Sequence, residues 1–158
     1  MTRGVLIDVA AVKGQDRLPD GYVVTAEDLQ EALRKQNLTL QAGDAVLIRT
    51  GWDVLRGKEN EKYANAGAGI GVGAANWLAS QNPMLVGADN CCVEVRPSEK
   101  GLSLPVHSIM LTQFGIHLLE NLRLAALARA GAQEFAFIIQ PLKMKGATGS
   151  SVAPVAIR

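Results

Sequence analysis

The sequence has few of the residues that usually build disulfide frameworks or metal sites, with two cysteines and two histidines among 158 residues. Cys91 and Cys92 are adjacent, so they cannot cross-link distant segments, and no CxxC metal spacing is present. Such cysteine usage fits a reducing cytoplasm. We therefore expect a cytoplasmic protein in which both thiols are buried and structural.

Long apolar runs and a strong charge of one sign are also absent. No stretch of about 20 apolar residues occurs, which argues against a transmembrane helix, and residues 1–14 lack the pattern of a signal peptide. Sixteen basic residues face fifteen acidic ones without clustering, for a formal charge of +1. Nucleic acid is not expected as a partner either, because binding it needs a concentrated basic surface.

The sequence does contain the pattern of one α/β domain. Its length, with 48% apolar and 20% charged residues, is typical of a single globular unit. Apolar runs predict strands at 4–9, 45–50, 84–88, 116–119 and 134–140, with a last short strand in the tail at 146–157. Helices are predicted at 26–36, 73–80, 105–114 and 124–129, and loops at 56–67 and 96–104. Apolar strands separated by helices predict a sheet covered by helices.

A glycine-rich segment at 67–73 invites comparison with a nucleotide-binding loop. Gly69, Gly71 and Ala74 fit the pattern G-x-G-x-x-A and lead into a predicted helix. A dinucleotide loop must follow a strand directly, and residues 61–65 do not have a strand pattern. We therefore favour a flexible loop and a helix start over a nucleotide site.

Trp52 and Asp89 follow the ends of two predicted strands. The carboxyl ends of strands in α/β sheets commonly face a ligand crevice, which makes both residues candidates for substrate binding. Asp89 could equally be a turn residue that caps its own backbone. The alternative for Trp52 is packing in the core or at an interface.

The apolar segment 104–122 carries two residues of a different kind, His107 and Glu120. His107 borders a predicted buried stripe that ends at Phe114, so it is either a satisfied core histidine or a ligand. A carboxylate such as Glu120 at a buried strand end is costly unless it is paired, hydrogen-bonded or metal-bound. Imidazole plus carboxylate is a fragment of a zinc or manganese site, although catalytic zinc usually has three protein ligands. The other histidine, His117, is expected to be structural or on the surface.

Seven short motifs occur in order along the chain: Arg3–Asp8 (RGVLID), Thr25–Leu29 (TAEDL), Gly43–Trp52 (GDAVLIRTGW), Gly87–Asp89 (GAD), Pro105–His107 (PVH), Glu120–Leu122 (ENL) and Lys145–Gly149 (KGATG). Together they resemble the Putative cyclase family, which includes bacterial kynurenine formamidase and isatin hydrolase. The resemblance runs from about residue 3 to 157. It implies a single α/β domain over residues 1–158 with the swivelling β/β/α fold, a mixed sheet with flanking helices, and a tendency to oligomerise.

The resemblance also implies a function and a set of site residues. Family members are metal-dependent hydrolases of N-formyl aryl amides, such as the N-formylkynurenine of tryptophan and kynurenine catabolism, or of cyclic amides. His107 matches a family histidine of the metal centre, and Glu120 matches its carboxylate partner. Trp52 and Asp89 fall in segments near the family's substrate cleft. The implied cofactor is a divalent metal, zinc or manganese.

One family motif has no counterpart here. The signature His-x-x-x-His-x-Asp, followed by an acid/base histidine, lies in the family upstream of the segment that matches residues 3–8. We therefore expect this chain to correspond to the C-terminal part of such an enzyme, with its catalytic residues unassigned. A homo-oligomer or a partner chain would supply the missing segment. The alternative is a non-catalytic binding or assembly module that keeps the fold.

Overall fold

The structure, a computed structural model, describes residues 1–99 and 103–158. Its strands are β1 (Thr2–Asp8), β2 (Val23–Val24), β3 (Ala45–Arg49), β4 (Gly69–Ile70), β5 (Leu85–Ala88), β6 (His117–Leu119), β7 (Glu134–Ile138) and β8 (Val155–Ile157). Its helices are α1 (Val9–Val12), α2 (Ala26–Gln36), the 3-10 helix η1 (Trp52–Leu55), α3 (Asn60–Asn65), α4 (Val72–Ser80), α5 (Pro105–His107), the π-helix η2 (Ser108–Gln113) and α6 (Ala125–Arg129). The predicted loop at 96–104 lies partly outside the described residues.

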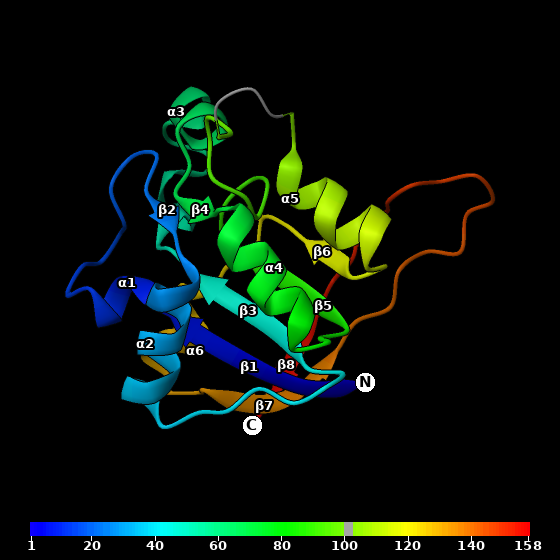
Figure 1. The fold of residues 1–158 in the computed structure, drawn as a ribbon, viewed down its shortest axis with the longest axis horizontal. Coiled ribbons are helices and arrows are strands. Elements are labelled where there is room, and N and C mark those ends of the chain that lie inside the picture. Colours follow the sequence, from blue (N-terminus) through cyan, green and yellow to red (C-terminus); the bar gives the residue numbers. More distant parts are fainter. Residues whose placement is uncertain (100–102) are drawn as a thin grey trace.

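Six strands form one mixed sheet in the order β6-β5-β3-β1-β7-β8 (Figure 1). Strands β1, β3, β5 and β6 are parallel neighbours, whereas β7 runs antiparallel to β1 and β8 antiparallel to β7. Strands β2 and β4 pair in a separate small parallel sheet. The predicted mixed sheet with flanking helices is confirmed.

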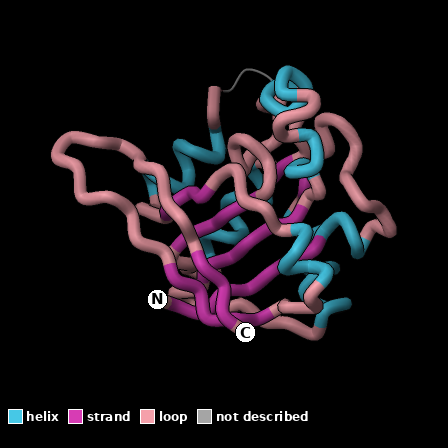
Figure 2. Tube along the Cα trace, turned by 180° about the vertical axis from the view of Figure 1, so that it is seen from behind, coloured by secondary structure: helices cyan, strands magenta, loops and turns pink. Residues whose placement is uncertain are grey.

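Both faces of the sheet are covered, which explains why its strands are apolar throughout. In β3, Val46 and Ile48 join the larger core, which contains the buried residues of α2 and α4, while the alternating Leu47 joins the core on the opposite face. That second core includes Leu124 and Phe135 and has α6 packed against it (Figures 1 and 2). The period of two therefore distributes the side chains of β1, β3 and β5 between two cores.

Helix α2 begins and ends as its sequence predicts. The Thr25 hydroxyl accepts a hydrogen bond from the Asp28 N–H at 3.2 Å, and the Asp28 carboxylate accepts one from the Thr25 N–H at 3.1 Å. This reciprocal capping box satisfies two backbone donors at the helix start.

Two predicted segments were wrong in part. The loop expected at 56–67 contains α3. Only Tyr63 of this helix is buried, so the sequence shows no helical period of apolar residues there. The helix expected at 105–114 changes from α to π winding at Ser108. The wider π turn changes which side chains face the core, and Phe114, expected to be buried, is 53% exposed.

Asp89 ties the ends of two parallel strands together. Its side chain is fully buried, and its Oδ1 accepts hydrogen bonds from the Thr50 N–H at 2.8 Å and the Thr50 hydroxyl at 2.6 Å. Its Oδ2 accepts one from the Gly51 N–H at 2.8 Å. Asp89 therefore caps the end of β3 rather than its own turn. Burial raises the pKa of Asp89 to about 6.

The same turn requires a glycine. Gly51 has a φ of 81°, and a Cβ added there would lie 2.1 Å from the backbone oxygen of Asp16. A side chain at this position would force the turn after β3 away from the segment that contains Asp16.

Replacing Gly51 with alanine should lower the free energy of unfolding by at least about 3 kcal/mol, because unfavourable φ adds about 1–2 kcal/mol to the cost of the clash. Gly43→Ala is the matched control, since Gly43 has a φ of 86° but open space around its Cβ position. It should lose only the cost of the unfavourable φ, about 1–2 kcal/mol. Urea denaturation of both variants measures the difference, and equal losses would contradict the clash.

The buried Asp89 should make stability depend on pH. Because its folded pKa of about 6 lies above the ordinary 3.8, the folded state holds the proton more tightly. The contribution of Asp89 to stability is therefore largest below pH 4 and declines as the pH rises to about 6. The unfolding free energy of the wild type, relative to Asp89→Asn, should fall by about 3 kcal/mol between pH 4 and pH 7. A difference that stays constant across this range would contradict the raised pKa.

Candidate metal centre

The structure brings His107 and Glu120 together. His107 is the last residue of α5, and its Nε2 lies 3.2 Å from Oε1 of Glu120, which directly follows β6. On the other side of the ring, Nδ1 lies 2.5 Å from Oε1 of Glu94. The imidazole is thus held between two carboxylates, and the role of His107 and Glu120 as metal ligands stays a prediction.

Glu94 is the fixed member of this trio, with an exposure of 1%. Its Oε2 also accepts a hydrogen bond from the Val106 N–H at 3.3 Å. The turn that presents it is organised by the buried Asn90, whose Oδ1 accepts from the Val93 N–H at 2.8 Å and whose Nδ2 donates to the Ala68 carbonyl at 2.7 Å. The buried carboxylate therefore has a defined position and defined partners.

Glu94 could not be recognised as a site residue from the sequence. It stands between Val93 and Val95, and strand alternation would have placed it on the opposite side from these two apolar residues. All three side chains are buried, because the chain bends here instead of continuing as a regular strand.

The solvent exposure of the three side chains increases from Glu94 through His107 to Glu120. The side chains are 1%, 24% and 35% exposed for Glu94, His107 and Glu120. The hydrogen bonds with Glu120 and Glu94 raise the pKa of His107 to about 9. An ion or a substrate would therefore reach the imidazole from the side of Nε2 and Glu120.

The loop that carries Glu120 is held by its neighbour Asn121. The Tyr63 hydroxyl donates a hydrogen bond to Asn121 Oδ1 at 2.9 Å, and Arg56 Nη1 donates to the Asn121 carbonyl at 2.5 Å. The Asn121 N–H donates to the Asn90 carbonyl at 2.9 Å. The turns that present Glu94 and Glu120 are thereby joined through backbone hydrogen bonds.

The two predicted substrate-binding residues, Trp52 and Asp89, are both fully buried. Trp52 donates from Nε1 to the Leu18 carbonyl at 3.3 Å, and the Arg17 guanidinium lies 4.9 Å from the centre of its ring. Trp52 and Asp89 have packing and capping roles here, without exposed surface for a ligand. Their contact with a substrate stays a prediction.

The glycine-rich segment at 67–73 allows the backbone to pack closely against the segment that contains Glu94. A Cβ on Gly69 would lie 2.5 Å from the carbonyl oxygen of Glu94. The start of α4 is occupied by Glu99, whose carboxylate accepts a hydrogen bond from the Val72 N–H at 2.8 Å. A negative group already lies where a phosphate would bind. This agrees with the predicted loop and helix start, although the short strand β4 also lies in this segment.

The remaining candidates are on or near the surface. Cys91 and Cys92 are free and half-buried, so the expectation of full burial was wrong. A hydrogen bond from Cys92 lowers the pKa of the Cys91 thiol, and the pKa of Cys92 is raised correspondingly. His117 is exposed, which confirms the predicted surface position.

The donors present form part of a metal shell. Within residues 1–99 and 103–158, no three His, Cys, Asp or Glu side chains are placed to hold one ion together. His107 Nε2 and Glu120 nevertheless offer an imidazole nitrogen and a carboxylate oxygen, which both suit zinc or manganese. Glu94 has the place that a carboxylate behind a ligating histidine takes in metal sites.

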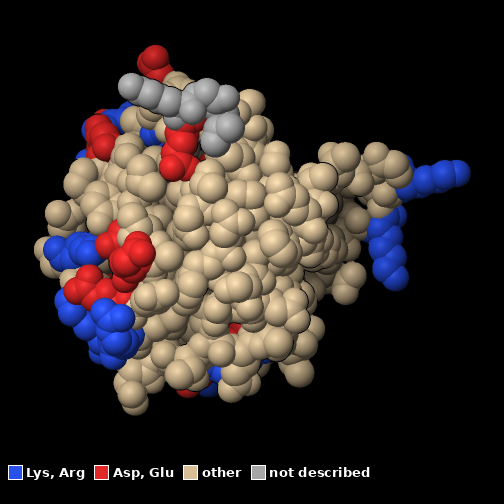
Figure 3. Space-filling view, in the orientation of Figure 1, with Lys and Arg blue, Asp and Glu red and all other residues tan. Residues whose placement is uncertain are grey.

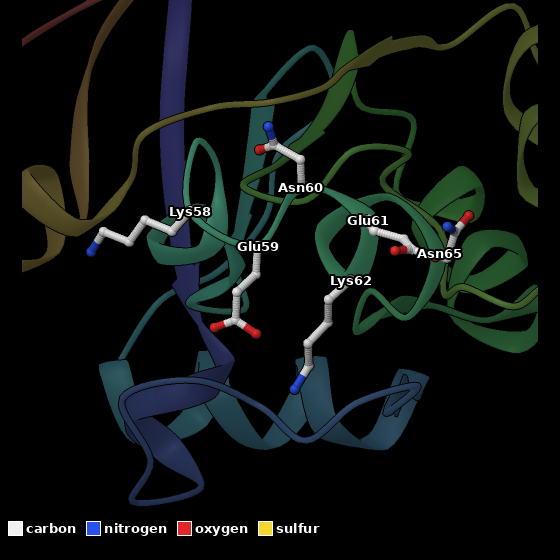
Figure 4. Close-up of a pocket in the computed structure, with 6 residues that line it drawn as sticks. All are labelled: Lys58, Glu59, Asn60, Glu61, Lys62 and Asn65. Carbon is white, nitrogen blue, oxygen red and sulfur yellow. The ribbon is translucent and has the colours of Figure 1, made fainter.

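A surface hollow of about 610 Å³ lies elsewhere on the molecule, at α3 and the residues just before it (Figure 4). Its lining residues are Lys58, Glu59, Asn60, Glu61, Lys62 and Asn65. Lys62 is paired with Asp20 at 2.9 Å. The hollow contains none of the candidate site residues, so it does not extend the His107–Glu120 pair. In the part of the chain that the structure describes, no helix is long and apolar enough to cross a bilayer.

Comparisons with known proteins place this chain in a family. The model of the family described as Putative cyclase matches residues 1–95. A solved structure described as a novel cyclase is 36% identical with a TM-score of 0.86, and the match covers 99% of this chain and 53% of that chain. A comparison with curated proteins found no match.

More distant solved structures share the fold. Isatin hydrolase A from Ralstonia solanacearum is 24% identical with a TM-score of 0.80, over 99% of this chain and 60% of that one. A structure described as a predicted metal-dependent hydrolase from Bacillus stearothermophilus is 20% identical with a TM-score of 0.70, over 98% and 62%. The chain thus spans between 53% and 62% of these three relatives. By its family match and its 36%-identical relative, the chain belongs to the Putative cyclase family.

Proposed function

We propose that this chain provides part of the metal centre of a cyclase-family amide hydrolase. The observation that carries the proposal is the position of His107, with Nδ1 at the buried Glu94 and Nε2 at the more exposed Glu120. A carboxylate at Nδ1 holds that proton in place, so that Nε2 is directed toward an incoming ion.

His107 and Glu120 are the residues that would hold the ion, which we assign as zinc or manganese. Since a catalytic zinc usually has three protein ligands, further donors would come from outside the described residues. This chain matches only 53% of the 36%-identical cyclase, so such donors would lie in the unmatched part of a protein of that kind. They would belong to a homo-oligomer or to a polypeptide partner.

The bound metal would supply an acidified water, with a pKa lowered to about 7. The chain's own residues have a positioning role in this chemistry. Glu94 fixes the ring of His107, while Tyr63 and Arg56 fix the loop of Glu120 through Asn121. This preorganisation keeps the two donors in place before a substrate arrives.

We propose an amide as substrate, either an N-formyl aryl amide such as N-formylkynurenine or a cyclic amide. Three of the structures that share the fold are named isatin hydrolases, and isatin is a cyclic amide. The contacts of Trp52 and Asp89 with such a substrate belong to the same proposal.

Metal binding tests the pair directly. Isothermal titration with Zn²⁺ and Mn²⁺ should show one site, and His107→Gln or Glu120→Gln should weaken it at least about tenfold, because each removes a direct ligand. Glu94→Gln should weaken it about 10–100-fold through the lost support of the ring.

Matched controls keep this titration specific. His117→Gln changes the exposed second histidine, and Glu61→Gln changes an exposed carboxylate on α3. Both should bind the metal as the wild type does. A site that is lost equally in His117→Gln, or kept in His107→Gln, would contradict the assignment.

Hydrolysis tests the activity. N-formylkynurenine and isatin should be hydrolysed in the presence of zinc or manganese when the part of the 36%-identical cyclase that this chain does not match is added as a separate polypeptide. His107→Gln should reduce that turnover at least about 100-fold, because a metal ligand is lost. Absence of turnover in every combination, with the metal bound, would contradict the proposed hydrolase.

A second function, a non-catalytic binding or assembly module, is favoured by one observation. The described residues offer two donors, and no three of their His, Cys, Asp or Glu side chains are placed to hold one ion together. This function predicts a folded chain that neither binds zinc tightly nor gains activity from any added polypeptide, and tight binding that depends on His107 would oppose it.

A further inference from the structure

Strand β8 forms an open edge of the main sheet. It is the last strand in the sheet order and pairs with β7, with Ile138 opposite Val155 and Ala136 opposite Ile157. No strand of the described residues lies on its other side. Val155 and Ile157 are 49% and 52% exposed. A free strand edge with exposed apolar side chains is a template for pairing with another strand.

The connection between β7 and β8, residues 139–154, projects from the body of the molecule (Figures 1 and 2). Leu142 and Met144 in it are 62% and 50% exposed. A hydrogen bond from the Leu142 N–H to the Ser150 hydroxyl at 3.1 Å joins the two sides of the projection. Together with Val155 and Ile157 this makes an apolar surface on one hairpin, which is typical of an interaction site.

The connection between β7 and β8 carries charge of one sign. Between residues 135 and 157 the only charged residues are Lys143 and Lys145. Figure 3 shows the projecting part as uncharged apart from basic side chains at its end. A partner that covers this surface would therefore present an apolar strand edge together with acidic residues.

The 36%-identical cyclase indicates what this partner is. Its match covers 99% of the present chain, so the hairpin belongs to the shared fold. Only 53% of the cyclase chain is matched. A polypeptide equivalent to the unmatched part needs a surface on which to dock, and the open edge of β8, with its exposed apolar side chains, offers one.

We propose that the β7–β8 hairpin is the docking surface for a polypeptide equivalent to the unmatched part of that cyclase, whether joined to this chain or separate. A strand of this polypeptide extends the sheet beyond β8, Leu142 and Met144 are buried against it, and Lys143 and Lys145 meet its acidic side chains. The inference rests on the proposed function, since the docked polypeptide brings the further metal ligands.

Binding can be measured without metal or activity. The unmatched part of the 36%-identical cyclase, produced as a separate polypeptide, is titrated into this chain in the presence of EDTA. It should bind the wild type at one to one. Ile157→Glu and Met144→Glu should each weaken binding at least tenfold, because each places a charge in the apolar contact.

Leu111→Glu is the matched control, because Leu111 is likewise an exposed apolar residue, 46% exposed, but lies on η2. It should bind as the wild type does. The double variant Lys143→Glu and Lys145→Glu should weaken binding and reduce its dependence on salt. Since all these side chains are exposed, thermal denaturation should show unchanged folding.

Each outcome separates the two proposals. Absence of binding, or equal losses in Leu111→Glu and Ile157→Glu, would overturn the hairpin assignment. Hairpin-dependent binding without hydrolysis upholds this inference and contradicts the hydrolase function. Restored hydrolysis with unchanged binding of Ile157→Glu and Met144→Glu upholds the hydrolase function and overturns the hairpin assignment. A homodimer in native mass spectrometry that Ile157→Glu dissociates would make a second copy the occupant and overturn the partner proposed.

Discussion

The buried carboxylate of Glu94 is the constraint on which the candidate site depends. A carboxylate with 1% exposure is tolerated only when its oxygens have partners. Here one oxygen faces His107 Nδ1 and the other accepts from the Val106 N–H. The first turn of α5 and its histidine are therefore anchored to the core by one side chain. The direction of Nε2 toward Glu120 follows from that anchor.

The parallel part of the sheet explains why distant residues meet. Since β3, β5 and β6 run in the same direction, their carboxyl ends lie along one edge. Asp89 joins the ends of β3 and β5, and Asn121 joins the turns after β5 and β6. Glu94 and Glu120, each 13 residues away from His107 in the sequence, thus meet at its ring.

Much of the fold could be predicted from local pattern. The apolar runs at β1, β3, β5 and β7 and the capping box of α2 lie in consecutive residues, and the helix-covered sheet follows from them, whereas the mixed strand directions were implied by the family resemblance. The two-residue strands β2 and β4 could not be predicted, because they exist only through tertiary pairing and have no period of their own. The π winding of η2 was likewise invisible, since it depends on how the helix meets the core, and it moved Phe114 to the surface.

The candidate site was predictable only in part. His107 and Glu120 stood out because burying polar side chains in an apolar segment costs free energy unless they are hydrogen-bonded, paired or metal-bound. Glu94 did not, because its neighbours Val93 and Val95 suggested an alternation that the bent backbone does not follow. For Asp89, the position at a strand end was visible in the sequence, but its partners at Thr50 were not, since contacts across 39 residues leave no local pattern.

The tautomer and metal response of His107 can be observed directly by nitrogen NMR of the histidine side chains during a zinc titration. The chain has two histidines, so the spectrum is simple to assign. We predict that Nδ1 of His107 keeps its proton at Glu94 while Nε2 loses its proton and shifts to the position of a metal-bound nitrogen, with His117 unchanged. If Nε2 of His107 does not respond to zinc, or Nδ1 is the nitrogen that loses its proton, the proposed orientation is wrong.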